Sequence, residues 1–325
     1  MTEHPPLRII LGATASGKER LALACARRMN GEIVSVDSMK VYRGLDIATA
    51  KAGPAERASV RHHCLDLVDP SETFSAADFV AAAEAAIADI LARGKIPFLS
   101  GGTAFYYKAL LEGLFDGPKA DPEIRARLEE RATTEGNAAL HAELAEKDPA
   151  AAAKIHPSDL RRIVRALEVN TLTGRGISQS QTQWADFHHP DAARRAASFF
   201  AAPRHPFIMV RVVRDRDDSR ARIASRIARM AELGLEAEAR MVWEKRDHIS
   251  ITPLQAVGYK EFFPYFAGEI SWADALEKLR LGTNRLVRSQ DTWFRKFPAT
   301  EMFMGRDADV EQMAEKLMSR EFALD

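Results

Sequence analysis

The sequence predicts an α/β protein, in which helices flank a parallel sheet and an all-helical segment is inserted into the chain. Three observations predict this fold. Apolar strand-like segments alternate with amphipathic helical segments over residues 1–118. Polar residues follow the ends of these strands, as in doubly wound sheets. From Pro122 to about Gly174 the chain is rich in Ala, Glu and Arg, with helical periodicity and no strand signal.

The first part of the chain contains three predicted strands, each followed by a helix. The strands are LRIILG from Leu7, GEIVSV from Gly31 and KIPFLSG from Lys95. The helices are KERLALACARRM, AADFVAAAEAAIADILAR and AFYYKALLEGL. Gly94 marks the end of the second helix, since glycine commonly ends helices.

The later part of the chain returns to the sheet once. FIMVRVVRD, from Phe207, is a predicted strand, and the pattern from Ser219 onward is mainly helical. We therefore expect a catalytic core formed by residues 1–118 and 205–325, with a helical C-terminal part, and an inserted helical domain over residues 119–204.

Composition limits the class of protein. Of 325 residues, 46% are apolar and 28% charged, as in ordinary globular proteins, and no run of about 18 apolar residues predicts a membrane span. Two cysteines form no disulfide framework, so we expect a cytoplasmic protein. The net charge of zero argues only weakly against nucleic acid, because seven arginines lie between Arg211 and Arg229.

The first strand leads into a phosphate-loop signature. Gly12, Gly17 and Lys18 fit the pattern G-x-x-x-x-G-K, although Glu19 stands where Ser or Thr is usual. Backbone N–H groups of such a loop, the helix start and the lysine together bind a diphosphate or triphosphate. The alternative is a glycine turn followed by a chance lysine. The strand before the loop and the helix after it favour the first interpretation and a P-loop NTPase-like fold.

Two further polar residues follow strand ends on the same edge of the predicted sheet. Asp37 can accept a proton from an attacking nucleophile, and Thr103 faces the same crevice. Gly101 and Gly102 allow close backbone approach there. The alternative for both Asp37 and Thr103 is a helix cap.

Seven segments, in this order, resemble the tRNA dimethylallyltransferases (isopentenyltransferases of the MiaA type). They are GATASGK, SVDSMKVYRGLDIATAK, HHCLDLVDPSETFSAADF, SGGTAFYYKALLEGL, DLRRIVRALEVNTLTGRGIS, VGYKE and RSQDTWFRKF. The resemblance extends from Ile9 to about Phe297. It implies transfer of a dimethylallyl group from dimethylallyl diphosphate to the N6 amine of the adenosine on the 3′ side of the anticodon. The tRNAs concerned read codons that begin with U, and diphosphate is released.

The resemblance also implies roles for particular residues. Asp37, Thr103 and Lys18 are the expected catalytic residues. The diphosphate site is expected to comprise Gly12, Ala13, Thr14, Ala15, Ser16, Gly17, Lys18, Glu19 and Arg222. The tRNA-binding residues are expected to be Asp37, Ser38, Met39, Lys40, Thr103, Arg125, Arg161, Arg162 and Arg165. The insertion is expected to grip the anticodon arm. The alternative for Arg161 and Arg165 is a solvated helix face with a salt bridge to Glu168.

Glu19 is the main departure from the family, whose Thr or Ser binds Mg²⁺. We expect Mg²⁺ as cofactor, Glu19 as its ligand, and a stronger magnesium dependence than in relatives. We also expect a monomer. Two other functions remain open: a P-loop kinase acting on a small molecule, and a tRNA-binding protein that Glu19 has made catalytically silent. Labelled ATP, tested against labelled dimethylallyl diphosphate plus tRNA, separates them.

Overall fold

The computed structural model describes residues 5–114, 117–180, 200, 202–306 and 308–322. The chain forms two compact units: residues 1–111 with 202–325, and residues 112–201. The insertion predicted for residues 119–204 includes residues 181–199 and 201, which lie outside the described residues.

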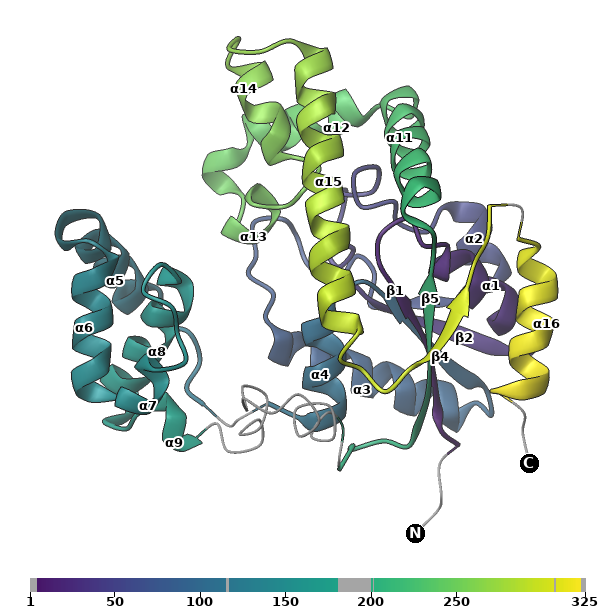
Figure 1. Cartoon of the computed structure of the whole chain (residues 1–325), viewed down its shortest axis with the longest axis horizontal. Coiled ribbons are helices and arrows are strands. Elements are labelled where there is room, and N and C mark those ends of the chain that lie inside the picture. Colours follow the sequence, from purple (N-terminus) through teal and green to yellow (C-terminus); the bar gives the residue numbers. More distant parts are fainter. Residues whose placement is uncertain (1–4, 115–116, 181–199, 201, 307, 323–325) are drawn as a thin grey trace. The chain divides into compact units, whose positions relative to one another are not determined.

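The first unit is built on a parallel sheet of six strands in the order β3-β2-β4-β1-β5-β6 (Figure 1). The strands are β1 (Leu7–Gly12), β2 (Gly31–Val36), β3 (His62–His63), β4 (Ile96–Gly101), β5 (Phe207–Val213) and β6 (Thr300–Phe303). The sheet confirms the predicted fold class and the four longer strands. The strands β3 and β6 were not predicted, because edge strands of two and four residues are too short to show a periodic pattern.

The register of the central strands aligns their carboxyl ends. Gly101 of β4 pairs with Leu11 of β1 and with Val36 of β2. The phosphate loop after Gly12, the turn after Val36 and the loop after Gly101 therefore leave the sheet at the same edge. Ligands bind at this edge in open α/β sheets.

Helices cover both faces of this sheet (Figure 1). α1 and α16 pack together on one face, and α3 and α4 lie on the other. Ile10, Val210 and Val212 alternate along β1 and β5 and pack with Leu21 of α1 and Leu317 of α16. The bounds are α1 (Lys18–Arg28), α2 (Pro54–Ser59), α3 (Ala76–Ala92), α4 (Ala104–Glu112) and α16 (Val310–Arg320).

A second apolar core of this unit lies among the helices after β5. Ile223, Val242, Tyr259 and Leu279 are buried there with Tyr42, from the loop that follows β2. The helices are α11 (Arg216–Glu232), α12 (Leu235–Glu244), α13 (Ile251–Leu254), α14 (Phe263–Phe266) and α15 (Trp272–Phe294), with 3-10 turns η2 (Arg246–His248) and η3 (Lys260–Phe262). This packing joins the loop after β2 to the helical C-terminal part of the chain.

The described part of the second unit consists of helices around their own core of Leu128, Leu140, Leu144, Ile163 and Leu167. The helices are α5 (Pro122–Glu135), α6 (Asn137–Lys147), α7 (Pro149–Ala152), α8 (Leu160–Thr173) and α9 (Ile177–Ser180).

A buried aspartate between α6 and α7 is bound to α9 in this helical unit. Asp148 accepts hydrogen bonds from the amide of Ser178 at 2.9 Å and from its hydroxyl at 2.6 Å. A Cβ at Gly176 would lie 2.6 Å from an Asp148 oxygen. The segment TGRGIS therefore has a structural role, in which Gly176 makes room for the aspartate.

Candidate active site

The phosphate loop has the backbone that its glycines predict. Gly17 has a φ of 97° and Ala15 a φ of 65°, so the amides between β1 and α1 turn inward. A Cβ at Gly12 would lie 2.7 Å from the Ser16 Oγ. Within the described residues, the amides of Ala15 and Gly17 have no protein acceptor. These two N–H groups and the start of α1 can therefore bind an anion.

Asp37 follows β2 and is held in one orientation. Its Oδ1 accepts hydrogen bonds from the amides of Met39 at 2.8 Å and Lys40 at 3.3 Å. The alternative of a capping role is thus partly right, although the residue caps a turn and not a helix. Among the described residues no donor contacts the other carboxylate oxygen, Oδ2. That oxygen is available to accept a proton.

Thr103 connects the ends of β4 and β2. Its Oγ1 accepts a hydrogen bond from the amide of Ser38 at 3.1 Å, and its own amide donates to the Val36 carbonyl at 3.2 Å. A Cβ at Gly101 would lie 2.0 Å from the Val36 carbonyl oxygen. Only glycine allows this close approach, which brings the Thr103 hydroxyl next to the turn that carries Asp37.

Gln290 of α15, which the sequence analysis missed, joins the phosphate loop to the loop after β4. Its Oε1 accepts a hydrogen bond from the Thr14 amide at 2.8 Å, and its Nε2 donates to the Gly102 carbonyl at 3.1 Å. The residue lies in the segment RSQDTWFRKF, where the cations and aromatics are the more conspicuous side chains. Gln290 makes the two loops one connected structure.

Cationic side chains surround the phosphate loop. Lys18 is buried, and its ammonium lies 3.4 Å from the Ala13 carbonyl. Burial lowers the pKa of Lys18 below its usual value, Lys40 and Arg226 add to this shift, and Glu19 and Asp37 oppose it. Burial also lowers the pKa of Arg226, against the effect of Glu19 and Asp37. Arg226 therefore faces the same site as the two carboxylates.

Arg222, the arginine expected at the diphosphate, has different neighbours. Burial and the charges of Arg214 and Arg20 lower its pKa, while Asp218 opposes the shift. Arg214 donates to the Ser16 carbonyl at 3.3 Å and forms an ion pair with Asp218. Arg222 thus lies with a group of arginines on the Ser16 side of the loop.

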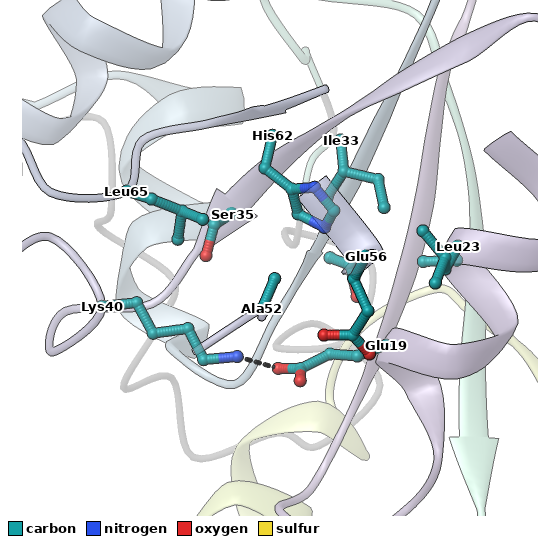
Figure 2. Close-up of a pocket in the computed structure, with 11 residues that line it drawn as sticks. Glu19, Leu23, Ile33, Ser35, Lys40, Ala52, Glu56, His62 and Leu65 are labelled. Carbon is teal, nitrogen blue, oxygen red and sulfur yellow. Dashed lines mark hydrogen bonds and ion pairs between the residues drawn. The ribbon is translucent and has the colours of Figure 1, made fainter. Parts of the chain in front are cut away.

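Glu19 is bound to Lys40. The Lys40 ammonium donates a hydrogen bond to the Glu19 carboxylate, and the two side chains meet across a pocket (Figure 2). The pocket is also lined by Ser35, His62 and Ser100. Burial alone would raise the pKa of Glu19, but Lys40 and Lys18 lower it to about 2. The carboxylate is therefore ionised and already neutralised.

This pairing does not fit the expected magnesium ligand. A metal bound to Glu19 would have to displace the Lys40 ammonium, and the surrounding charges at Lys18 and Arg226 oppose a further cation. Across the described residues, no group of three or more His, Cys, Asp or Glu side chains is placed to hold a metal ion.

A buried lysine organises the segment that carries Lys40. The Lys51 ammonium donates hydrogen bonds to the Tyr42 carbonyl and to Asp66, each at 2.7 Å, and pairs with Asp46 at 2.5 Å. The Asp66 amide in turn donates to the Lys40 carbonyl at 3.2 Å. The segments DSMKVYRGLDIATAK and HHCLDLVDP thus support each other.

Glu238 and Tyr259 hold the same segment from the other side. The Glu238 carboxylate accepts hydrogen bonds from the amides of residues 46, 47 and 48 at 2.8, 2.7 and 2.9 Å. The Tyr259 hydroxyl donates to it at 2.8 Å. A Cβ at Gly258 would lie 2.8 Å from the Ala48 Cβ, so glycine is needed at this contact. The segment VGYKE is therefore an anchor, a role that its sequence alone did not indicate.

The four arginines expected at the tRNA lie in the helical unit and differ in their surroundings. Arg125 donates to the buried Glu168 carboxylate at 2.8 and 2.9 Å, and Arg165 donates to it at 2.6 Å. Arg162 pairs with Asp159 at 3.3 Å. Arg161 is exposed. The alternative of a salt bridge to Glu168 thus holds for Arg165, whereas Arg161 forms no ion pair within the described residues.

The sheet order, the loop after the central strand and the polar strand ends together define a P-loop protein, whose loop has the geometry to hold an anion. A family model described as IPP transferase matches residues 40–297, which is most of the chain. The chain belongs to the IPP transferase family.

Relatives and solved structures agree with this assignment. The chain is 43% identical to the tRNA dimethylallyltransferase of Methylococcus capsulatus over 324 residues, which covers 98% of each chain. It is 46% identical to that of Bordetella avium over 299 residues, 90% of this chain and 91% of the relative. The full-length tRNA isopentenylpyrophosphate transferase of Bacillus halodurans has a TM-score of 0.67 at 36% identity, covering 97% of this chain and 94% of its own.

A eukaryotic dimethylallyltransferase acting on tRNA shares the fold, with a TM-score of 0.72 at 24% identity, covering 97% of this chain and 77% of its own. Within the described residues, no helix combines the length and the apolar character that crossing a membrane requires.

Proposed function

We infer that this chain is a tRNA-modifying prenyl transferase, which moves a dimethylallyl group from dimethylallyl diphosphate to a tRNA adenosine. The observation that carries this inference is the joining of the phosphate loop to the strand ends that bear Asp37 and Thr103. Gln290 and the hydrogen bond from Ser38 to Thr103 make these segments one site. The similarity to tRNA dimethylallyltransferases over nearly the whole chain names the reaction. It does not favour a small-molecule kinase.

The proposed chemistry is a displacement at the allylic carbon. The exocyclic N6 amine attacks this carbon, an N–C bond forms, and the C–O bond to the diphosphate breaks. The bonding electrons leave with the diphosphate oxygen, and the amine proton passes to Asp37. Loop amides and Lys18 stabilise the charge that develops on the leaving group. The open Oδ2 of Asp37 supports its role as base.

The remaining roles follow from position. Thr103 and the turn of Ser38, Met39 and Lys40 lie beside Asp37, where an unstacked adenine must enter. The helical unit, with Arg161 exposed, is proposed to bind the anticodon arm of tRNAs that read codons beginning with U. We propose a monomer acting in the cytoplasm, where tRNA is found. Magnesium remains a proposal: the residues present do not fit an ion held by Glu19, and no step here depends on one.

A transfer assay tests the function. Dimethylallyl diphosphate labelled in the allyl group is incubated with an anticodon stem-loop that has adenosine on the 3′ side of the anticodon. Label in the RNA, at that adenosine alone, is the expected result. A stem-loop with guanosine at the same position is the matched control and should take up none. If the protein binds the RNA but transfers no label under any condition, it is a catalytically inactive member of the family. That is the alternative which Glu19, in place of Thr or Ser, left open.

A further inference from the structure

Two buried lysines of the same segment have different surroundings. The Lys51 side chain is 1% exposed and has three acceptors: the Tyr42 carbonyl, Asp66 and Asp46. An ammonium group has three N–H donors, so that of Lys51 is fully satisfied. Lys51 is therefore complete as a structural residue, with no donor left for a ligand.

Lys40 is nearly as buried but is not satisfied. Its side chain is 7% exposed, and Glu19 is the one group in the described part of the chain that accepts a hydrogen bond from its ammonium. Two of its three N–H donors therefore lack a protein acceptor. Leaving buried charged donors unpaired costs free energy, so an arrangement of this kind is expected where a ligand supplies the acceptors.

The pocket in front of Lys40 contains a second unpaired polar group. The Ser100 side chain is buried, and its Oγ has no hydrogen-bond partner among the described residues. Ser100 precedes Gly101 at the end of β4, beside the strand that leads into the phosphate loop. It lines the same pocket as Lys40 and Glu19. Unused donors from two different segments thus face one space next to the loop.

Glu19 holds Lys40 in that place. It is the second residue of α1, directly after Lys18, and its side chain is 43% exposed. The ion pair therefore fixes the Lys40 ammonium at the first turn of α1, the helix that follows the phosphate loop. The two lysines also influence each other electrostatically, since Lys40 helps to lower the pKa of Lys18.

We propose that Lys40, positioned by Glu19, is a second diphosphate-binding ammonium that takes over part of the charge neutralisation a metal at position 19 would provide. This inference rests on the proposed function. Lys40 donates hydrogen bonds to the diphosphate as the C–O bond breaks, while the amine proton still goes to Asp37. The sequence alone predicted a stronger magnesium dependence than in relatives. This proposal predicts the opposite: diphosphate binding depends less on magnesium than in a protein with threonine at position 19 and no lysine at position 40.

Pyrophosphate binding, measured by calorimetry in EDTA and at saturating magnesium, tests this without requiring catalysis. The key variant is Glu19→Thr combined with Lys40→Gln, which removes the ion pair and leaves no unpaired carboxylate. We expect it to bind pyrophosphate about 10- to 100-fold more weakly than the native protein in EDTA, the usual value of a hydrogen bond to a charged group. The difference should shrink when magnesium is added.

One single variant and one control complete the design. Lys40→Arg keeps a cation and should retain most of the metal-free binding. The control is Arg28→Gln with Glu311→Gln, which removes an exposed ion pair of 2.9 Å at the other end of α1 and should change nothing. Melting temperatures of all variants verify that they fold.

Two results would overturn the inference. If the double variant binds pyrophosphate in EDTA as tightly as the native protein, Lys40 merely neutralises Glu19. If the native protein binds none in EDTA, magnesium is indispensable despite Lys40. If instead the proposed function is wrong, the results differ from these two. Neither the native protein nor any variant transfers label to the stem-loop, but pyrophosphate binding in EDTA still depends on Lys40.

Discussion

At the scale of single residues, the site depends on which polar atoms are already used inside the protein and which are left open. Asp37 uses Oδ1 to hold a turn and leaves Oδ2 open. Lys51 has no donor to spare, whereas Lys40 has two. Residues whose polar atoms are all used, such as Lys51, hold the site together, whereas residues with open polar atoms, such as Asp37 and Lys40, can bind a substrate. Both kinds occur in the segment DSMKVYRGLDIATAK.

The first prediction concerns Asp37. Asp37→Asn keeps an oxygen that can accept the hydrogen bonds from Met39 and Lys40 but removes the base. We expect single-turnover transfer to fall by about 10²- to 10⁴-fold, the usual value of acid–base catalysis, with pyrophosphate binding little changed. Asp37→Ala should be at least as slow. Near-native rates in the asparagine variant would show that the aspartate serves only the turn.

At the scale of elements, helices distant in the chain fix the loops that carry the site. Gln290 of α15 holds the phosphate loop, and Glu238 of α12 holds the segment that follows Lys40. Both contacts reach loops at the carboxyl edge of the sheet. The helical C-terminal part is therefore a frame for the site, which explains why it is part of the same compact unit as the sheet.

The second prediction tests this frame at Tyr259. Tyr259→Phe removes one hydrogen bond to Glu238 and keeps the buried ring, so it should lower the free energy of unfolding by about 0.5–1.5 kcal/mol. If the frame positions Lys40, kcat should fall while KM for the stem-loop changes little. Tyr265→Phe is the matched control, since its hydroxyl donates to Glu236, whose carboxylate pairs with Arg240 of the same helix. If both variants change kcat equally, Tyr259 stabilises the fold but does not position Lys40.

The third prediction concerns pH and the buried carboxylate of β2. The hydrogen bond from Arg93, followed by those from Lys95 and His63, holds the pKa of Glu32 well below its usual value against the effect of burial. A lowered carboxylate pKa stabilises the fold above the ordinary pKa of glutamate, near 4.5, and this stabilisation is lost as the pH falls below it.

Denaturant unfolding of the native protein and of Glu32→Gln provides the measurement. The native protein should be the more stable of the two at pH 7, and the gap should narrow as the pH is lowered past about 4.5. Glu135→Gln, which alters an exposed ion pair in the helical unit, is the control and should show a much smaller gap. If the difference in free energy of unfolding between the native protein and Glu32→Gln does not change with pH, the pKa of Glu32 is not lowered in the folded state.

At the scale of the whole molecule, the sequence predicted the fold class, the four longer strands and the phosphate loop, because these depend on local patterns. Glycine spacing, strand alternation and polar strand ends are visible within short windows. The Glu19–Lys40 pair was not predictable, since each residue alone suggests a different partner. The contact between Thr14 and Gln290 joins residues 276 positions apart, which no local pattern encodes. The short strands β3 and β6 arise only from pairing with longer neighbours.

The last prediction concerns the helical unit as a tRNA-binding part of the molecule. Arg161 is the appropriate residue to change, because it is exposed, whereas removing Arg125 or Arg165 would strip partners from the buried Glu168 carboxylate and disturb the fold. Arg161→Ala should weaken tRNA binding and reduce the slope of log affinity against log salt by about 0.7–0.9 if it contacts one phosphate. Binding of dimethylallyl diphosphate should be unchanged.

The matched control for Arg161 is Arg131→Gln, in the same unit, since Arg131 is paired with Glu135 and Glu143, each at 2.9 Å. An arginine engaged by two carboxylates has little charge to offer a phosphate, so this variant should bind tRNA with the native salt dependence. Filter binding or fluorescence anisotropy across a salt series measures both variants. An unaltered affinity and slope for Arg161→Ala would mean that the arginine faces solvent, and the tRNA contact would have to be sought on another face of the insertion. A shift of equal size in both variants would instead indicate a general effect of charge on the helical unit, because only a direct phosphate contact distinguishes a free arginine from a paired one.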